Sequence, residues 1–338
     1  MRKATRNSAV AVISAANKII KSNSVLERLT LQALSILPYQ WIPPNRVSFE
    51  LTNICNLHCP LCPTTNVMKR KKGMMTLEDF KVIARKLKEA GVKQLDMNYA
   101  GEMTLNPNIF KMIKYANSLG LKSEVSTNGT SAKTRELIEA EPTSILFAMD
   151  GITKKTQEAY RRNSKFEDVY KHLKELCYYK KKLNTKTMII WQFIPMKHNE
   201  HEIKDVIRIA KEIGVDRLDL KTASLFDEIL GKDKKTLAEK FLPKNKTYTR
   251  YSAEQTINKP IFCPAIYMPL ILYNGDVTLC CYDYDGKYSF GNILTENSFK
   301  KIWKSQRLKK IRRSIIKLTL PLCQKCTMGV GGSIIFRF

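Results

Sequence analysis

Two spacings of apolar residues alternate along the central part of the chain. Short runs rich in apolar and β-branched residues predict buried strands, and segments whose apolar residues recur every three or four positions predict amphipathic helices. The segment from Leu77, after the cap signal Thr76-Leu-Glu-Asp79, is such a helix and ends at Gly91. The predicted strands are Arg46–Leu51, Gln94–Asn98, Lys122–Thr127, Ser144–Met149, Lys186–Phe193 and Asp216–Lys221. The other predicted helices are Ile109–Leu119, Ala132–Ala140, Lys154–Arg161, Phe166–Lys182 and Glu202–Ile213.

This regular strand–helix alternation predicts parallel βαβ units and an α/β fold. In parallel sheets the functional loops follow the carboxyl ends of the strands. Four polar or reactive stretches fall at such ends: the cysteine loop after residue 51, Ala100-Gly101-Glu102, Asn128-Gly129 and Asp150-Gly151. We therefore expect these four stretches to meet at one edge of the sheet.

The regions that flank the alternating part have other patterns. Residues 1–45 predict an amphipathic helical pair, which either packs on the core or touches an anionic membrane surface. Residues 223–262 form a Lys-rich stretch with little periodicity and are interpreted as a linker. Leu270–Tyr273 and Val277–Cys280, joined at Asn274-Gly275, predict a β-hairpin. The expected regions are thus 1–45, 46–222, 223–262 and 263–338.

Charge and cysteine content narrow the class of protein. The 338 residues carry a net charge of +27, which is typical either of binding to nucleic acid, acidic substrates or membrane surfaces, or of solvated basic faces. No apolar run reaches the roughly 18–20 residues of a membrane span. The nine cysteines, clustered at 55–62 and 263–326, favour metal-bound reduced thiols and a cytoplasmic setting over a secreted disulfide framework.

Cys55, Cys59 and Cys62 have the spacing C-x3-C-x2-C directly after the first predicted strand. Three such thiols can bind three irons of a 4Fe–4S cluster and leave the fourth iron open. The alternative is a zinc site, which requires a fourth ligand; His58 is the nearest candidate.

This motif resembles the signature of the radical S-adenosylmethionine (SAM) superfamily. The resemblance covers roughly residues 46–222 and implies a partial (β/α)6 barrel, a SAM-binding 4Fe–4S cluster, and cleavage of SAM to a 5′-deoxyadenosyl radical that abstracts a substrate hydrogen. It further implies contacts to SAM from the Leu61 backbone and from Gly101, Glu102, Ser126, Asn128, Asp150 and Arg161. Ala100 stands where the family's Gly-Gly-Glu element has its first glycine, and Leu61 where the family often has an aromatic residue.

The C-terminal cysteines follow the pattern C-x11-G-x4-C … C-x2-C. This pattern resembles the auxiliary-cluster region called SPASM, or its shortened twitch form, and implies a small C-terminal domain. The ligands of one auxiliary 4Fe–4S cluster would be Cys263, Cys280, Cys323 and Cys326, with Cys281 as an adjacent alternative or a spare thiol. A zinc ribbon is the competing interpretation of the same four cysteines.

The leading hypothesis is a radical SAM enzyme that acts on a peptide, sugar or small polar metabolite, with dehydrogenation, cross-linking or epimerisation as outcomes. It would need a reducing partner such as flavodoxin or ferredoxin. The segment before residue 46 shows no peptide-recognition domain, which disfavours a leader-peptide mechanism within this chain. The alternatives are an RNA-modifying radical SAM enzyme and a non-catalytic, zinc-binding nucleic-acid-binding protein.

Overall fold

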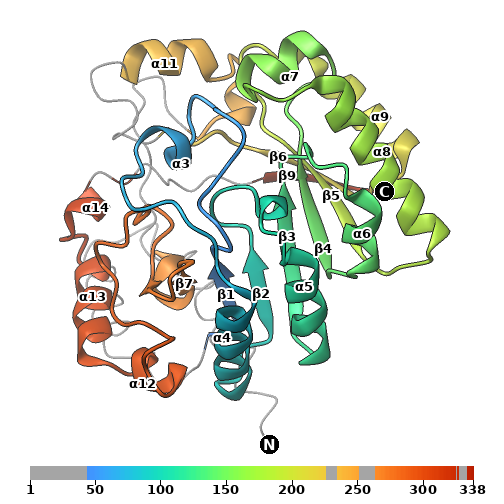
Figure 1. Cartoon of the computed structure of the whole chain (residues 1–338). Helices are drawn as coiled ribbons and strands as arrows, with labels where there is room; N and C mark the ends of the chain where they lie inside the picture. Colours follow the sequence, from blue (N-terminus) through green and yellow to red (C-terminus); the bar gives the residue numbers. More distant parts are fainter. Residues whose placement is uncertain (1–43, 226–233, 251–262, 325, 327–332) are drawn as a thin grey trace, which may run out of the picture.

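A single curved sheet forms the centre of the molecule (Figure 1). The computed structural model describes residues 44–225, 234–250, 263–324, 326 and 333–338. The expected N-terminal helical pair therefore lies outside the described residues, except for its last two positions. Among the described residues the sheet has nine strands in the order β8-β7-β1-β2-β3-β4-β5-β6-β9, and this order does not close on itself. This is the partial barrel that the resemblance implied.

All six predicted strands form, and neighbouring ones pair in parallel. They are β1 Arg46–Phe49, β2 Gln94–Met97, β3 Lys122–Thr127, β4 Ser144–Ala148, β5 Met188–Phe193 and β6 Arg217–Lys221. Three of them, β1, β2 and β4, end one or two residues earlier than the sequence pattern suggested, and the residues beyond their ends belong to the loops that follow. The C-terminal ends of these six strands lie at one edge of the sheet.

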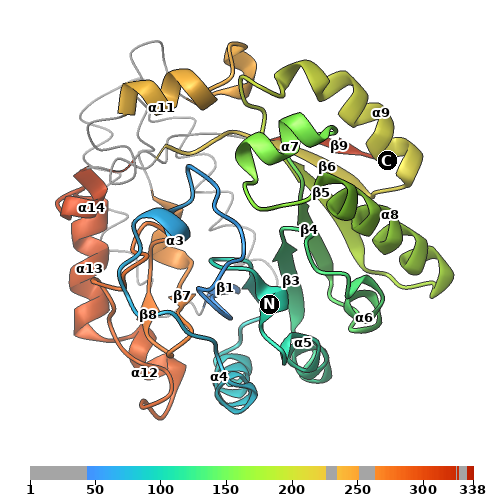
Figure 2. The same ribbon diagram turned by 45° about the horizontal axis from the view of Figure 1, so that its top comes forward.

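The helices between these strands cover the outer side of the sheet (Figure 2). They are α4 Leu77–Glu89, α5 Ile109–Ser118, α6 Thr134–Glu139, α7 Lys154–Tyr160, α8 Phe166–Lys182 and α9 Ile203–Ile213. Helix α4 shows why the local sequence specifies them: the Thr76 side chain accepts a hydrogen bond from the Asp79 backbone N–H (3.0 Å), and Phe80, Ile83 and Leu87 are fully buried. None of the helices in the described ranges has the length and apolar character that a bilayer span requires.

The C-terminal region extends the same sheet. Strand β7 (Leu270–Ile271) pairs in parallel with β1, and β8 (Val277–Thr278) pairs antiparallel with β7. The predicted hairpin thus forms, with shorter strands than expected, around a left-handed Gly275 (φ 86°). Helices α12 (Phe299–Trp303), α13 (Gln306–Ile316) and α14 (Pro321–Gln324) stand beside the hairpin (Figure 1).

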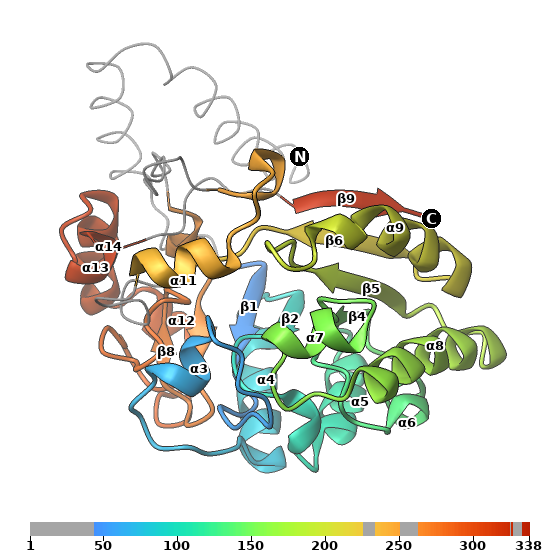
Figure 3. The same ribbon diagram turned by 90° about the horizontal axis from the view of Figure 1, so that it is seen from above.

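Two features were not predicted. Strand β9 (Ser333–Arg337) pairs antiparallel with β6 and becomes the far edge of the sheet. Helix α11 (Lys234–Phe241) lies within the stretch interpreted as a linker, and Figure 3 shows it across the end of the molecule that holds α3 (Pro63–Asn66) and α7. Its Ala238 and Phe241 pack with Leu57 and Leu61 of the cysteine loop in a second hydrophobic cluster. The described part of this stretch is therefore a packed element next to the first cysteine motif.

Candidate functional site

A cavity of about 290 Å³ lies at the C-terminal ends of the parallel strands. Residues from the loops after β1, β2 and β3, from the end of α7, and from β5 and β6 line it. Of the residues predicted for the first site, nine line this cavity: Cys55, Cys59, Leu61, Cys62, Gly101, Glu102, Ser126, Asn128 and Arg161. Residues that are distant in the sequence thus meet at the C-terminal ends of the strands, as the sequence predicted.

The three cysteines of the first motif lie in a tight, internally bonded loop. The Cys62 N–H donates to the Cys59 carbonyl (3.1 Å), and the Asn66 side-chain amide donates to the carbonyls of both residues (3.0 and 2.7 Å). Burial raises the pKa of Cys55, and it raises that of Cys59 to about 11, while the nearby Arg161 charge opposes both shifts. These thiols need a strong positive partner to ionise, and iron of a cluster would provide it.

The donor set fits a 4Fe–4S cluster. The charges of Cys55, Cys59 and Cys62 affect one another, so the three sulfur atoms lie together at the cavity wall. No three His, Cys, Asp or Glu residues in the described ranges converge closely enough to hold one metal ion. A cluster makes a different demand, because each thiolate binds a separate iron atom. His58, the candidate fourth zinc ligand, is exposed and does not line the cavity.

Gly101 brings the second loop against the cysteine loop. It has a left-handed backbone (φ 68°), and a Cβ atom there would lie 2.5 Å from the Thr52 carbonyl oxygen and 2.6 Å from that of Ile54. The next residue, Glu102, donates its backbone N–H to the Ile54 carbonyl (2.8 Å). Only glycine combines this backbone angle with so close an approach.

The Glu102 carboxylate joins the loops after β2 and β3. It is 2% exposed and accepts hydrogen bonds from the Asn128 N–H (2.6 Å), the Thr127 hydroxyl (2.8 Å) and the Thr104 hydroxyl (2.7 Å). Burial raises its pKa, and these hydrogen bonds act in the opposite direction. The Asn128 amide in turn donates to the Asn56 side chain (2.9 Å), next to Cys55. Ser126 is half-buried and lines the same wall.

Asp150 does not line the cavity. It is fully buried behind it, where its carboxylate accepts from Arg161 Nε (2.6 Å) and from the Ile194 N–H (2.7 Å). Arg161 reaches from this anchor to the cavity wall. The structure therefore separates the two roles that the sequence grouped together: Asp150 fixes Arg161, and Arg161 is the residue at the cavity.

Three of the predicted auxiliary cysteines, Cys263, Cys280 and Cys326, lie near one another. The charges of Cys326 and Cys281 raise the pKa of Cys263, after burial as the largest cause, and the charge of Cys263 contributes to that of Cys280. Four thiols therefore lie together, Cys281 among them. Cys323 is buried at the start of the C-x2-C turn, in which the Cys326 N–H donates to the Cys323 carbonyl (3.3 Å). Cysteines from three segments of the chain would thus be available to an auxiliary cluster.

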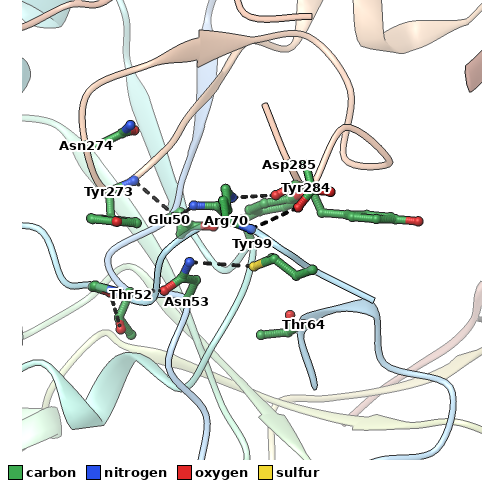
Figure 4. Close-up of polar contacts among 12 residues, drawn as sticks. Glu50, Thr52, Asn53, Thr64, Arg70, Tyr99, Tyr273, Asn274, Tyr284 and Asp285 are labelled. Carbon is green, nitrogen blue, oxygen red and sulfur yellow. Dashed lines mark hydrogen bonds and ion pairs between the residues drawn. The ribbon is translucent and has the colours of Figure 1, made fainter. Parts of the chain in front are cut away.

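Polar contacts, of which those of Arg70 are part-buried, join the two cysteine regions (Figure 4). Arg70, eight residues after Cys62, pairs with the fully buried Glu50 carboxylate and donates to the Tyr284 carbonyl. The backbone N–H of Lys69 donates to the Asp285 carboxylate (2.8 Å). Tyr99, just before Ala100, donates its hydroxyl to the Cys281 carbonyl (2.9 Å). The loop that follows Cys280 is thus held by the loop that follows Cys62.

Several cavity residues were missed from the sequence. Tyr160, Gln192, Ile194, Lys221, Thr222 and Ser224 line the wall formed by α7, β5 and β6. The strand-end rule that found Gly101 and Asn128 would also have found Gln192 and Lys221. The other four residues, Tyr160, Ile194, Thr222 and Ser224, belong to no recognisable motif, so only the fold identifies them.

Two family models match the chain. Residues 49–193 match the radical SAM superfamily, and residues 263–327 match SPASM, an iron–sulfur cluster-binding domain. The chain thus carries a radical SAM domain followed by a SPASM domain. The cofactors of these two domains are SAM with the 4Fe–4S cluster that binds it, and an auxiliary iron–sulfur cluster.

Curated relatives of this chain include a peptide cyclase and a maturase. The PqqA peptide cyclase of Bradyrhizobium diazoefficiens is 22% identical over 180 residues, which are 52% of this chain and 46% of that protein. The mycofactocin maturase MftC of Mycobacterium ulcerans is 22% identical over 292 residues, 78% of this chain and 76% of that protein. The chain thus spans less than half of the first relative and about three quarters of the second.

Solved structures share the radical SAM fold. Streptococcus suis SuiB bound to S-adenosylmethionine has a TM-score of 0.62 at 16% identity, covering 85% of this chain and 73% of that one. BtrN in complex with AdoMet and 2-DOIA has a TM-score of 0.54 at 14% identity, covering 84% and 93%. At these identities the likeness concerns the fold.

Proposed function

We propose that this protein cleaves SAM reductively and uses the resulting 5′-deoxyadenosyl radical to abstract a hydrogen atom from a peptide substrate. The observation that carries the proposal is the cavity that brings Cys55, Cys59 and Cys62 together with Gly101, Glu102 and Arg161. The names of two relatives, a peptide cyclase and a maturase, support a peptide over a sugar or a small metabolite.

The chain's own residues would then have distinct tasks. Cys55, Cys59 and Cys62 would hold the cluster that supplies the electron for SAM cleavage. Gly101 lets the loop after β2 pack against the cysteine loop. Glu102, Ser126, Asn128 and the Leu61 backbone would orient SAM in the cavity between them. Arg161, fixed by Asp150, places a positive charge beside the thiolates. Phe241 and Tyr160, whose ring centroids are 5.8 Å apart, close the side of the site behind Cys59 against water.

The auxiliary site would hold a second cluster through Cys263, Cys280, Cys323 and Cys326. We propose that it accepts the electron left on the substrate, so that the reaction is a net two-electron oxidation such as dehydrogenation or cross-linking. A low-potential donor such as flavodoxin or ferredoxin would reduce the first cluster. The cytoplasm, where thiols stay reduced, is the expected location.

Iron counting together with SAM cleavage tests this function. Oxygen-free, reconstituted wild type should contain about eight irons, and the Cys55→Ala, Cys59→Ala, Cys62→Ala variant about four. Only the wild type should form 5′-deoxyadenosine from SAM. A Cys263→Ala, Cys280→Ala variant serves as the matched control, because it should lose the auxiliary irons and keep SAM cleavage. Zinc in place of iron, or iron-loaded wild type that does not cleave SAM, would refute the proposal.

A further inference from the structure

Of the two cationic side chains in the cavity wall, Arg161 pairs with Asp150, whereas Lys221 forms no ion pair within the described part of the chain. Besides the cysteines, the charged residues of the wall are Glu102, Arg161 and Lys221. Glu102 accepts from Asn128 and its neighbours, and Arg161 donates to Asp150. The Lys221 ammonium makes one long contact, 3.5 Å to the Gln192 side-chain oxygen, and forms no ion pair with any described residue. An ammonium group has three N–H donors, so Lys221 retains donors for a ligand.

A second positive charge lies next to Lys221. Arg250 donates to the Thr222 hydroxyl (2.9 Å) and to the Thr222 carbonyl (3.2 Å), immediately after Lys221 in the chain. The Lys221 side chain is exposed at the end of β6, so its ammonium group can meet an anionic group that enters the cavity.

The position of Lys221 indicates which molecule would carry that anion. Lys221 ends β6, while the first cysteine motif follows β1, at the other end of the run of six parallel strands. Both line one cavity, and Cys281 is close enough for its charge to act on Lys221. A group bound at Lys221 would thus lie between the two cysteine regions, where a substrate must sit if both clusters act on it.

We infer that Lys221 binds a carboxylate of the substrate and so selects peptides that present an acidic side chain or a free C-terminus to the cavity. This inference rests on the proposed function for the identity of the substrate. The carboxylate of SAM offers the same chemistry, but the proximity of Lys221 to Cys281 favours the substrate.

The probe is a defined synthetic library of hexapeptides, offered at about 0.15 M salt to the reconstituted holoenzyme with SAM. The affinity for each selected acidic peptide is then compared with the affinity for its neutral twin, a peptide of the same sequence in which Glu is replaced by Gln, Asp by Asn, or the C-terminus is amidated. Three variants are measured beside wild type: Lys221→Gln, Lys221→Arg and, as a control of equal charge change, Lys211→Gln, whose side chain is exposed on α9. The twins distinguish a side-chain carboxylate from the C-terminal one.

Wild type should enrich acidic peptides and bind them about tenfold or more tightly than their neutral twins, as a charge-assisted hydrogen bond predicts. Lys221→Gln should abolish this preference without changing binding of the neutral twins, while Lys221→Arg and Lys211→Gln should retain it. Equal binding of acidic and neutral peptides by wild type, or a preference that survives in Lys221→Gln, overturns the inference. So does weaker SAM binding by Lys221→Gln with peptide selection unchanged. Failure of wild type to cleave SAM refutes the proposed function instead, because peptide binding is read without turnover.

Discussion

Breaking the buried ion pair of Glu50 and Arg70 tests most directly how the two cysteine regions are joined. The Glu50 side chain is fully buried and that of Arg70 is 14% exposed. Arg70 Nη1 donates to the Glu50 carboxylate (2.7 Å), Nη2 contacts its other oxygen, and the Tyr273 N–H adds a third donor (3.2 Å). We predict that Arg70→Met destabilises the protein strongly, because it leaves this carboxylate buried with only one donor.

The size of the effect follows from burial. Removing one partner of a buried ion pair costs about 3–5 kcal/mol, because the remaining charge stays desolvated. Glu50→Gln should cost less, since a neutral amide can still accept a hydrogen bond from Arg70. For a chain of 338 residues, the unfolding entropy is roughly 0.7 kcal/mol per degree, so Arg70→Met should lower the Tm by about 4–7 °C.

Thermal unfolding of the reconstituted protein measures this, with hydrogen exchange at residues 284–286 as a local readout. The double variant Glu50→Gln, Arg70→Met should be more stable than Arg70→Met alone, because the unpaired charge is gone. Arg208→Met is the matched control: Arg208 pairs with Asp205 and Glu212 on the surface of α9, so its loss should change the Tm little. If Arg70→Met unfolds within a degree of wild type, the pair does not hold the regions together and the reasoning fails.

Three further predictions concern single residues. Gly101→Ala should destabilise the protein more than Gly214→Ala and should weaken SAM binding. Both glycines have a left-handed backbone, but of the two only Gly101 has carbonyl oxygens where a Cβ atom would lie. Urea unfolding measures the loss of stability, and titration with SAM measures the loss of binding. Cys177, whose pKa burial raises to about 12, should react with iodoacetamide at pH 8 about a thousandfold more slowly than an unperturbed thiol, with a rate that rises with pH up to that value; alkylation followed by mass spectrometry measures it. Burial raises the pKa of Glu102 above its ordinary 4.5, so the contribution of Glu102 to stability falls as the pH rises through the raised value. The urea midpoint of Glu102→Gln should therefore depend less on pH between pH 4.5 and 7 than that of wild type. The same pH dependence in both proteins would contradict this.

The order of strands and helices could be read from the sequence because each element carries its own signal. Helix α8 matches its predicted range Phe166–Lys182, and β3 matches Lys122–Thr127, since periodicity and stop signals are local. The residues of the first site could be predicted from the sequence for a different reason. Parallel strands force their C-terminal loops together, so cysteines at one strand end and Gly101-Glu102 at the next had to meet.

What the sequence did not reveal depends on contacts between distant residues. Arg70 lies in a basic run that resembles any solvated loop, and only its contacts with Glu50 and Tyr284 show that it is buried. Helix α11 has few apolar residues, so its Lys-rich sequence resembled a linker, although Ala238 and Phe241 suffice to pack it on the cysteine loop. Strand β9 is largely exposed and is defined by pairing with β6.

The way the C-terminal region attaches fixes the second cysteine site relative to the first. A separate domain on a flexible linker would leave the distance between the sites variable. Here β7 pairs with β1, and β1 leads directly into the first cysteine loop. The hairpin therefore shares its backbone hydrogen bonds with the strand that positions Cys55, while Arg70 and Tyr99 hold the far side of the loop that carries Cys281. Relative movement of the two sites would break sheet pairing and a buried ion pair together, so the fold fixes their separation before any cofactor binds.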